Sequence, residues 1–97
     1  MELQIDRIRT TDTAEANLIV SCIRGPVCRG ARFRQIPGAV EAIDVELIQI
    51  AICCRPVQEL DPVHTALVTL PGTGTHHLMP GGSAVGWQII EGTNPPL

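Results

Sequence analysis

Apolar and polar residues alternate along several short stretches of this chain. Leu3 and Ile5 alternate with polar neighbours and Ile8 then changes the phase, so residues 3–9 are predicted as a strand with a bend or bulge. A second predicted strand, residues 17–24, contains a continuous apolar Leu-Ile-Val run. A strand that is apolar on both faces is expected in the centre of a sheet.

The next two predicted strands show different patterns. Over residues 31–36, Phe33 lies on one face and Arg32 and Arg34 on the other, so the arginine pair is expected to face outward. Over residues 43–54 the apolar positions change from odd to even numbers, which requires a bulge or burial of both faces. Further strands are predicted over residues 63–70 and 84–90, with turns or loops over 10–15, 71–75 and 80–82.

Composition supports an all-β protein. The 97 residues include eleven Ile and eight Val, and β-branched side chains favour strands over helices. Helical apolar spacing with capping signals does not persist over ten residues anywhere in the chain. Six strands in so short a chain leave exposed edges unless the sheet closes. We therefore expect a small, closed or partly closed, six-stranded antiparallel-rich β-barrel formed by residues 1–91, followed by a frayed tail over 92–97.

The chain carries no sequence signal for a membrane or for export. No apolar run approaches the roughly 20 residues of a spanning helix, and acidic residues near the N-terminus replace the basic start of a signal peptide. We expect a cytoplasmic protein without a membrane partner.

Charge is distributed unevenly in this lysine-free chain. Residues 1–36 contain six Arg and four acidic residues, whereas residues 37–97 contain one Arg and six acidic residues, giving +2 and −5. The basic segment consists of Arg24, Arg29, Arg32 and Arg34. These guanidinium groups are candidates for binding RNA phosphates or a protein partner. The alternative is a solvated face in which they pair with Glu41, Asp44 or Glu46, since the net charge of −3 repels nucleic acid.

The segment 23–33, Ile-Arg-Gly-Pro-Val-Cys-Arg-Gly-Ala-Arg-Phe, resembles a hairpin in the second domain of translational GTPases such as elongation factor Tu. Four positions match the family pattern, namely Gly25, Val27, Gly30 and Phe33. The later segments 45–52, 65–70, 79–81 and 84–86 follow the same order, so the resemblance covers about residues 3–90. It implies a six-stranded barrel that docks on RNA and on neighbouring protein domains without performing chemistry.

Two departures from that family limit what can be transferred. The chain contains no Gly-x-x-x-x-Gly-Lys-Ser/Thr loop, because it has no lysine, so the GTPase activity is absent. Residues 59–64, Glu-Leu-Asp-Pro-Val-His, replace the family's Ala-Gly-containing approach to the fifth strand. No residue of an aminoacyl-end pocket is therefore transferred.

The cysteines and histidines show no motif for metal or catalysis. The cysteines at 22, 28, 53 and 54 lack the C-x2-C spacing of zinc sites, and neighbours on a strand point to opposite faces, which separates Cys53 from Cys54. Core or surface thiols are the preferred interpretation, and a Cys-His pair such as Cys54 with His64 or His76 has no supporting pattern. His76 and His77 are expected in a solvated loop. Trp87 is expected in the core, or at an interface if exposed.

These patterns favour a stand-alone interaction module. It has no predicted catalytic residue, metal or cofactor, and it docks on ribosomal RNA or a protein partner through the four arginines. The alternative is an accessory or inhibitory protein-binding subunit, or a homo-oligomer, without RNA contact. A third hypothesis, an enzyme or metal protein using the cysteines and histidines, lacks a supporting motif.

Overall fold

A computed structural model of the chain describes residues 1–12, 14–40, 42–78 and 88–96. Its strands are β1 (Glu2–Thr11), β2 (Glu15–Arg24), β3 (Val27–Cys28), β4 (Arg32–Gln35), β5 (Asp44–Glu46), β6 (Gln49–Ile52), β7 (Arg55–Val57), β8 (Glu59–Leu60), β9 (Thr65–Thr73) and β10 (Ile89–Thr93), with one 3-10 turn, η1 (Thr75–His77). The described residues are thus all-β, as predicted.

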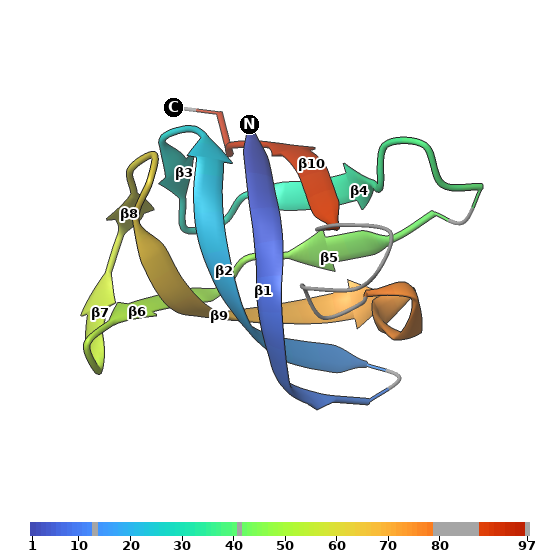
Figure 1. Ribbon diagram of the computed structural model, residues 1–97, viewed down its shortest axis with the longest axis horizontal. Coiled ribbons are helices and arrows are strands. Elements are labelled where there is room, and N and C mark those ends of the chain that lie inside the picture. The colour runs from blue at the N-terminus through green and yellow to red at the C-terminus, as the bar shows by residue number, and fades with distance from the viewer. Residues whose placement is uncertain (13, 41, 79–87, 97) are drawn as a thin grey trace.

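Six strand positions close into an antiparallel barrel (Figure 1). Around the ring, β1 pairs with β2, β2 with β9, β9 with β5, β5 with β4, β4 with β10, and β10 with β1. The chain continues from β5 into β6, which pairs with the first part of β9, and β7 extends the sheet beyond β6. A separate ribbon joins β3 to β8. The predicted closed six-stranded barrel is confirmed.

Alternation along the strands fills the interior of the barrel. On β2, Leu18 and Val20 are fully buried while Ile19 lies half-buried on the outer face. On β4, Phe33 is fully buried and both flanking arginines are exposed, as the sequence predicts. The central position of β2 is also confirmed, because this strand pairs with β1 on one side and β9 on the other.

The predicted irregularities occur where the strands bend around the barrel. The pairing of β1 with β2 shifts register on either side of Ile8. The single strand predicted over residues 43–54 is interrupted between β5 and β6, where Leu47 is fully buried and Ile48 is 44% exposed. At this interruption the inward-facing positions change from odd to even numbers. The segment can therefore contribute two strands, β5 and β6, that pair with different parts of the sheet.

Several predicted boundaries are wrong. Cys53 and Cys54 form a turn instead of ending a strand, and residues 71–73, predicted as a loop, continue β9. The loop prediction failed because Gly72 is needed for close approach: a Cβ there would lie 2.0 Å from the Asp44 carbonyl oxygen on the neighbouring strand. The turn predicted over 10–15 is shorter, since β1 extends through Thr11 and β2 begins at Glu15. The short strands β3, β7 and β8 were not predicted.

The last strand and the tail also differ from the prediction. The strand β10 occupies Ile89–Thr93 instead of residues 84–90, of which 84–87 lie outside the described residues. Gly92 and Thr93 pair with β4, so fraying from residue 92 is wrong for these two residues. Beyond them, the Asn94 side chain hydrogen-bonds the backbone of Pro26 and Cys28. The local Gly-Thr-Asn-Pro sequence is typical of a frayed terminus, but pairing with β4 keeps residues 92–93 in the sheet.

Candidate binding surface

Arg32 and Arg34 lie together on the outer face of β4, because both alternate with the buried Phe33. The Arg32 Nε lies 3.4 Å from Asp44 Oδ1 and its NH1 lies 3.6 Å from Glu46 Oε1. The Arg34 Nε lies 3.8 Å from the same Asp44 oxygen. The pairing of β4 with β5 therefore places two carboxylates beside the two guanidinium groups.

The other two predicted arginines lie on different elements. Arg24 ends β2 with its side chain 74% exposed, and its NH1 lies 3.9 Å from Glu2 Oε2. Arg29 follows β3, is exposed, and is held by its backbone N–H, which donates to the Gln58 carbonyl oxygen at 2.9 Å. The structure thus joins Arg32 and Arg34 through one shared carboxylate and places Arg24 and Arg29 at the β2–β4 connection.

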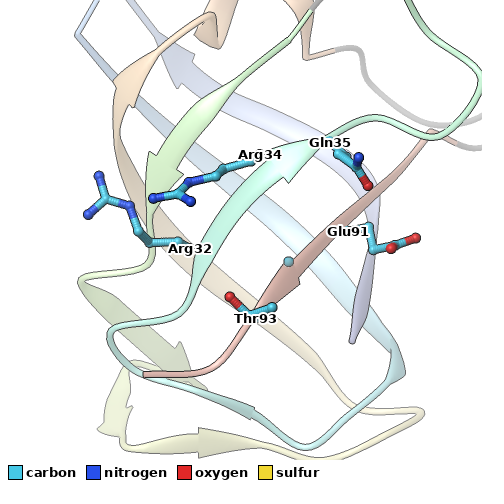
Figure 2. A pocket seen from close by; sticks show the side chains of 6 residues that line it. Arg32, Arg34, Gln35, Glu91 and Thr93 are labelled. Carbon is cyan, nitrogen blue, oxygen red and sulfur yellow. The ribbon is translucent and has the colours of Figure 1, made fainter. Parts of the chain in front are cut away.

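A surface hollow of about 260 Å³ lies over β4 and β10 (Figure 2). It is lined by Arg32, Arg34, Gln35, Glu91, Gly92 and Thr93. Figure 2 shows the two arginine side chains at one end of the hollow, with Gln35 and Glu91 close together at the other end. Guanidinium, amide, carboxylate and hydroxyl groups therefore surround one small space, which suits a ligand with several polar groups.

Two further hollows share the Arg34 side chain. One, of about 360 Å³, is lined by Arg34, Gln35 and the segment from Ile36 to Val40 together with Ala42. The other, of about 210 Å³, is lined by Gly30, Arg32, Arg34, Glu46, Thr93, Asn94, Pro95 and Pro96. We call these three hollows together the Arg34 groove. Its middle lies over β10, and its two ends lie at the loop after β4 and at the C-terminal tail.

The Arg34 groove is close to electrically balanced. The carboxylates of Asp44 and Glu46 lie within 4 Å of the Arg32 and Arg34 guanidinium groups, and the Glu91 carboxylate lies at the other end of the first hollow. A surface that binds a nucleic-acid backbone concentrates unbalanced positive charge. The groove is suited to a partner that offers both charges and hydrogen-bonding groups.

The sequence prediction missed half of this groove. Gln35, Glu91, Gly92 and Thr93 give no motif, and the three residues of β10 line the same hollow as the arginines only because β10 pairs with β4. The alternation on β4 was a usable signal for the arginine side, whereas β10 was predicted too early in the chain. Glu41, named as a possible partner of the arginines, lies outside the described residues.

The four thiols are not bonded to one another. Cys22 is buried, Cys28 is half-buried and Cys53 and Cys54 are exposed, all as free cysteines. Burial raises the pKa of the Cys22 thiol; the nearby Asp61 carboxylate raises it further, and the N-terminal ammonium group partly opposes both. The Cys28 Sγ lies 4.0 Å from Glu59 Oε2.

The histidines form no ligand set with other residues that the structure describes. His76 and His77 lie in η1, with ring centroids 4.0 Å apart, and His64 lies just before β9. Within the described ranges no three His, Cys, Asp or Glu side chains are grouped as metal ligands. Trp87, predicted in the core or at an interface, lies outside the described residues.

Comparisons with protein-family models, with curated proteins and with solved structures found no match for this chain. In the described residues no helix has the length and apolar character needed to cross a membrane.

Proposed function

We propose that this chain is a non-enzymatic binding module, a barrel similar in design to the second domain of translational GTPases, that docks on a protein partner through the Arg34 groove. The observation that carries the proposal is that Arg34 lines all three hollows on this face. Its side chain is 68% exposed and contacts one carboxylate, that of Asp44, at 3.8 Å. The guanidinium group retains donors that a partner can use.

The chemistry of the groove favours an extended polypeptide segment. Arg34, Gln35 and Thr93 offer hydrogen-bonding groups around the hollow over β4 and β10, and exposed Pro95 and Pro96 add apolar surface at one end of the groove. Arginine is common at protein interfaces because its planar group forms several directed hydrogen bonds. A partner segment carrying charged side chains of both signs together with apolar side chains fits these groups.

RNA fits the same surface less well. Asp44 and Glu46 lie within 3.4 to 3.8 Å of the arginine nitrogens and would lie near any phosphate bound there. The chain as a whole has a net charge of −3. Long-range attraction of a polyanion is therefore weak, and the protein partner is favoured.

The test compares two charge reversals in the tagged full chain. Arg34→Glu alters the groove, and Arg55→Glu is the matched control, because Arg55 is also exposed and lies on β7, away from β4 and β10 in Figure 1. Each protein is used for affinity capture from lysate at about 50 and about 300 mM salt, with and without nuclease. We expect one protein to be retained at both salt concentrations by wild type and by Arg55→Glu, and lost with Arg34→Glu.

Three outcomes contradict the proposal. Capture of nuclease-sensitive RNA that disappears at high salt would indicate phosphate binding instead. A light-scattering mass in multiples of 10.4 kDa that is unaffected by Arg34→Glu would indicate a homo-oligomer joined elsewhere. If Arg34→Glu and Arg55→Glu captured the same amount of the partner protein, the Arg34 groove would not be the binding surface.

A further inference from the structure

Two adjacent exposed cysteines form the tip of the β6–β7 hairpin. Ile52 pairs with Arg55, so Cys53 and Cys54 are the two turn residues between the strands. Their φ angles are 51° and 67°, both in the left-handed region, which defines a two-residue turn of type I′. In Figure 1 this hairpin lies on the opposite side of the view from β4 and β10.

The two thiols are not used to hold the fold together. Asn and Gly are the residues favoured at these two turn positions, and other side chains adopt positive φ at a cost. Neither Cys53 nor Cys54 forms a disulfide, hydrogen bond or ion pair within the described part of the chain, and both are exposed. Their side chains are free to react, and the turn itself would form more easily without them.

Both cysteines line one hollow of about 260 Å³. On a regular strand the two side chains would point to opposite faces, whereas in the turn both residues border the same space. The other lining residues are Arg9, Ile19, Ala51, Thr65, Ala66 and Leu67. Two thiols that border one hollow can bind the same ligand.

The floor of this hollow is apolar. Leu67 lies directly opposite Ile19 on one side and Ala51 on the other, so the three side chains form a row across β2, β9 and β6. Leu67 remains 37% exposed in this row. A ligand held by the two thiols can therefore place an apolar group on Leu67 and Ile19 and remove that surface from water.

We propose that Cys53 and Cys54 form a vicinal-dithiol site for a soft, thiophilic metal or metalloid centre that carries an apolar organic group, represented by a trivalent aryl arsenical. Thiolates select soft centres over hard cations. Zinc in a structural site needs four protein donors, and no third His, Cys, Asp or Glu joins these thiols within the ranges that the structure describes. A trivalent arsenical needs only two protein thiolates and supplies its third substituent itself.

The reaction with phenylarsine oxide balances without an oxidant. Each thiol loses its proton, two As–S bonds form, and the oxide oxygen leaves with the two protons as water. Arsenic stays trivalent and keeps its phenyl group. This step needs no residue of the Arg34 groove, so the proposed site is independent of the proposed function.

The test measures binding of phenylarsine oxide to the full chain, reduced and kept under nitrogen, by intact-protein mass spectrometry and by titration of free thiols. We expect one phenylarsenic group per chain, with loss of two thiols and release by a dithiol but not by a monothiol. Cys53→Ser and Cys54→Ser should each weaken binding by about 100-fold or more, because the second As–S bond is intramolecular. Cys28→Ser is the matched control and should bind like wild type.

Two further variants separate binding from folding. The double variant Cys53→Asn/Cys54→Gly carries the favoured turn residues, so it should fold and should not bind. Leu67→Asn should lower the affinity for phenylarsine oxide by about tenfold. The affinity for inorganic arsenite should not change, because arsenite has no group to place on the apolar floor. Wild-type affinity in either single Cys→Ser variant, or loss of binding in Cys28→Ser, would overturn the site. If Leu67→Asn kept the wild-type ratio of affinities for phenylarsine oxide and arsenite, the proposed contact with the apolar floor would be wrong.

Discussion

Gly92 lies against the backbone of Arg32: a Cβ at residue 92 would sit 2.1 Å from the Arg32 carbonyl oxygen and 2.8 Å from the Phe33 ring. The contact occurs where the pairing of β10 with β4 shifts register, between Glu91 and Gly92. Only a residue without a side chain lets the two backbones approach this closely. This approach closes the barrel and places Thr93 opposite Arg32 and Glu91 opposite Gln35.

We predict that Gly92→Ala destabilises the barrel by about 2–3 kcal/mol, because the added methyl group meets backbone that cannot move without disturbing the pairing. For a domain of this size the melting temperature should fall by about 10–20 °C. Thermal unfolding followed by circular dichroism measures the change.

Gly38→Ala is the control for Gly92→Ala. A Cβ at Gly38 meets no atom within 4 Å, and only its φ of 81° opposes the substitution. The expected loss is about 1 kcal/mol. Equal melting temperatures for the two variants would show that the close approach of Gly92 to the Arg32 backbone is not the cause of the destabilisation.

Asn94 fastens the C-terminal tail to the β2–β3 connection. Its Oδ1 accepts a hydrogen bond from the Cys28 N–H at 2.8 Å, and its Nδ2 donates to the Pro26 carbonyl oxygen at 2.9 Å. Asn94→Ala removes both bonds and should lower the free energy of unfolding by about 1 kcal/mol, since each is exposed to water. Urea unfolding measures this change. Pro96→Ala, in the same exposed tail, should change the value by less than about 0.5 kcal/mol, and an equal loss there would contradict the role of Asn94.

The buried Cys22 thiol makes stability depend on alkaline pH. Burial, with a further contribution from Asp61, raises its pKa in the folded protein above that in the unfolded chain. Its contribution is therefore fully present below the unfolded pKa of about 8.5 and is lost as the pH rises through the folded pKa, because the unfolded chain releases the proton first. Urea unfolding of the reduced protein between about pH 7 and pH 10 should show this decline.

Cys22→Ala isolates that effect. The variant should be less stable than wild type at neutral pH, since it loses a buried side chain, but its stability should fall less steeply above about pH 8.5. Parallel curves for the two proteins would show that another group controls the alkaline decline.

The β6–β7 turn should become more stable when its cysteines are replaced. In Cys53→Asn/Cys54→Gly both residues suit positive φ, so we expect a gain of about 1 kcal/mol and a melting temperature higher by about 4–8 °C. A lower melting temperature would indicate that the cysteine side chains contribute to packing. Cys28→Ser, outside the turn, should give no such gain.

Local pattern was sufficient for the fold class and for the arginine side of the groove. Alternation around Phe33 predicted which face of β4 carries Arg32 and Arg34, and the phase change after Leu47 predicted the irregularity between β5 and β6. Both signals depend on the two-residue period of a strand, which a sequence displays directly.

The side of the groove that β10 forms could not be read in the same way. Glu91 and Thr93 line the same hollow as Arg32 and Arg34 only because β10 pairs with β4, which joins segments about sixty residues apart. Cys53 and Cys54 were placed on a strand because the apolar run continued up to them, whereas the two positive φ angles make them a turn. Cys-Cys carries none of the Asn-Gly or Asp-Gly signal that is typical of such a turn.

The all-β class, the inward and outward positions and the uneven charge could all be predicted from the chain, because they depend on the identity and order of neighbouring residues. Asp44 and Glu46 were among the possible partners of the arginines in the sequence, and the folded protein pairs Arg32 with both. The closure of the barrel by β10 beside β4, and the single hollow that Cys53 and Cys54 border, arise only in the folded protein. These relationships depend on strand register and on the close backbone approaches allowed at Gly72 and Gly92, which arise only when distant strands pair.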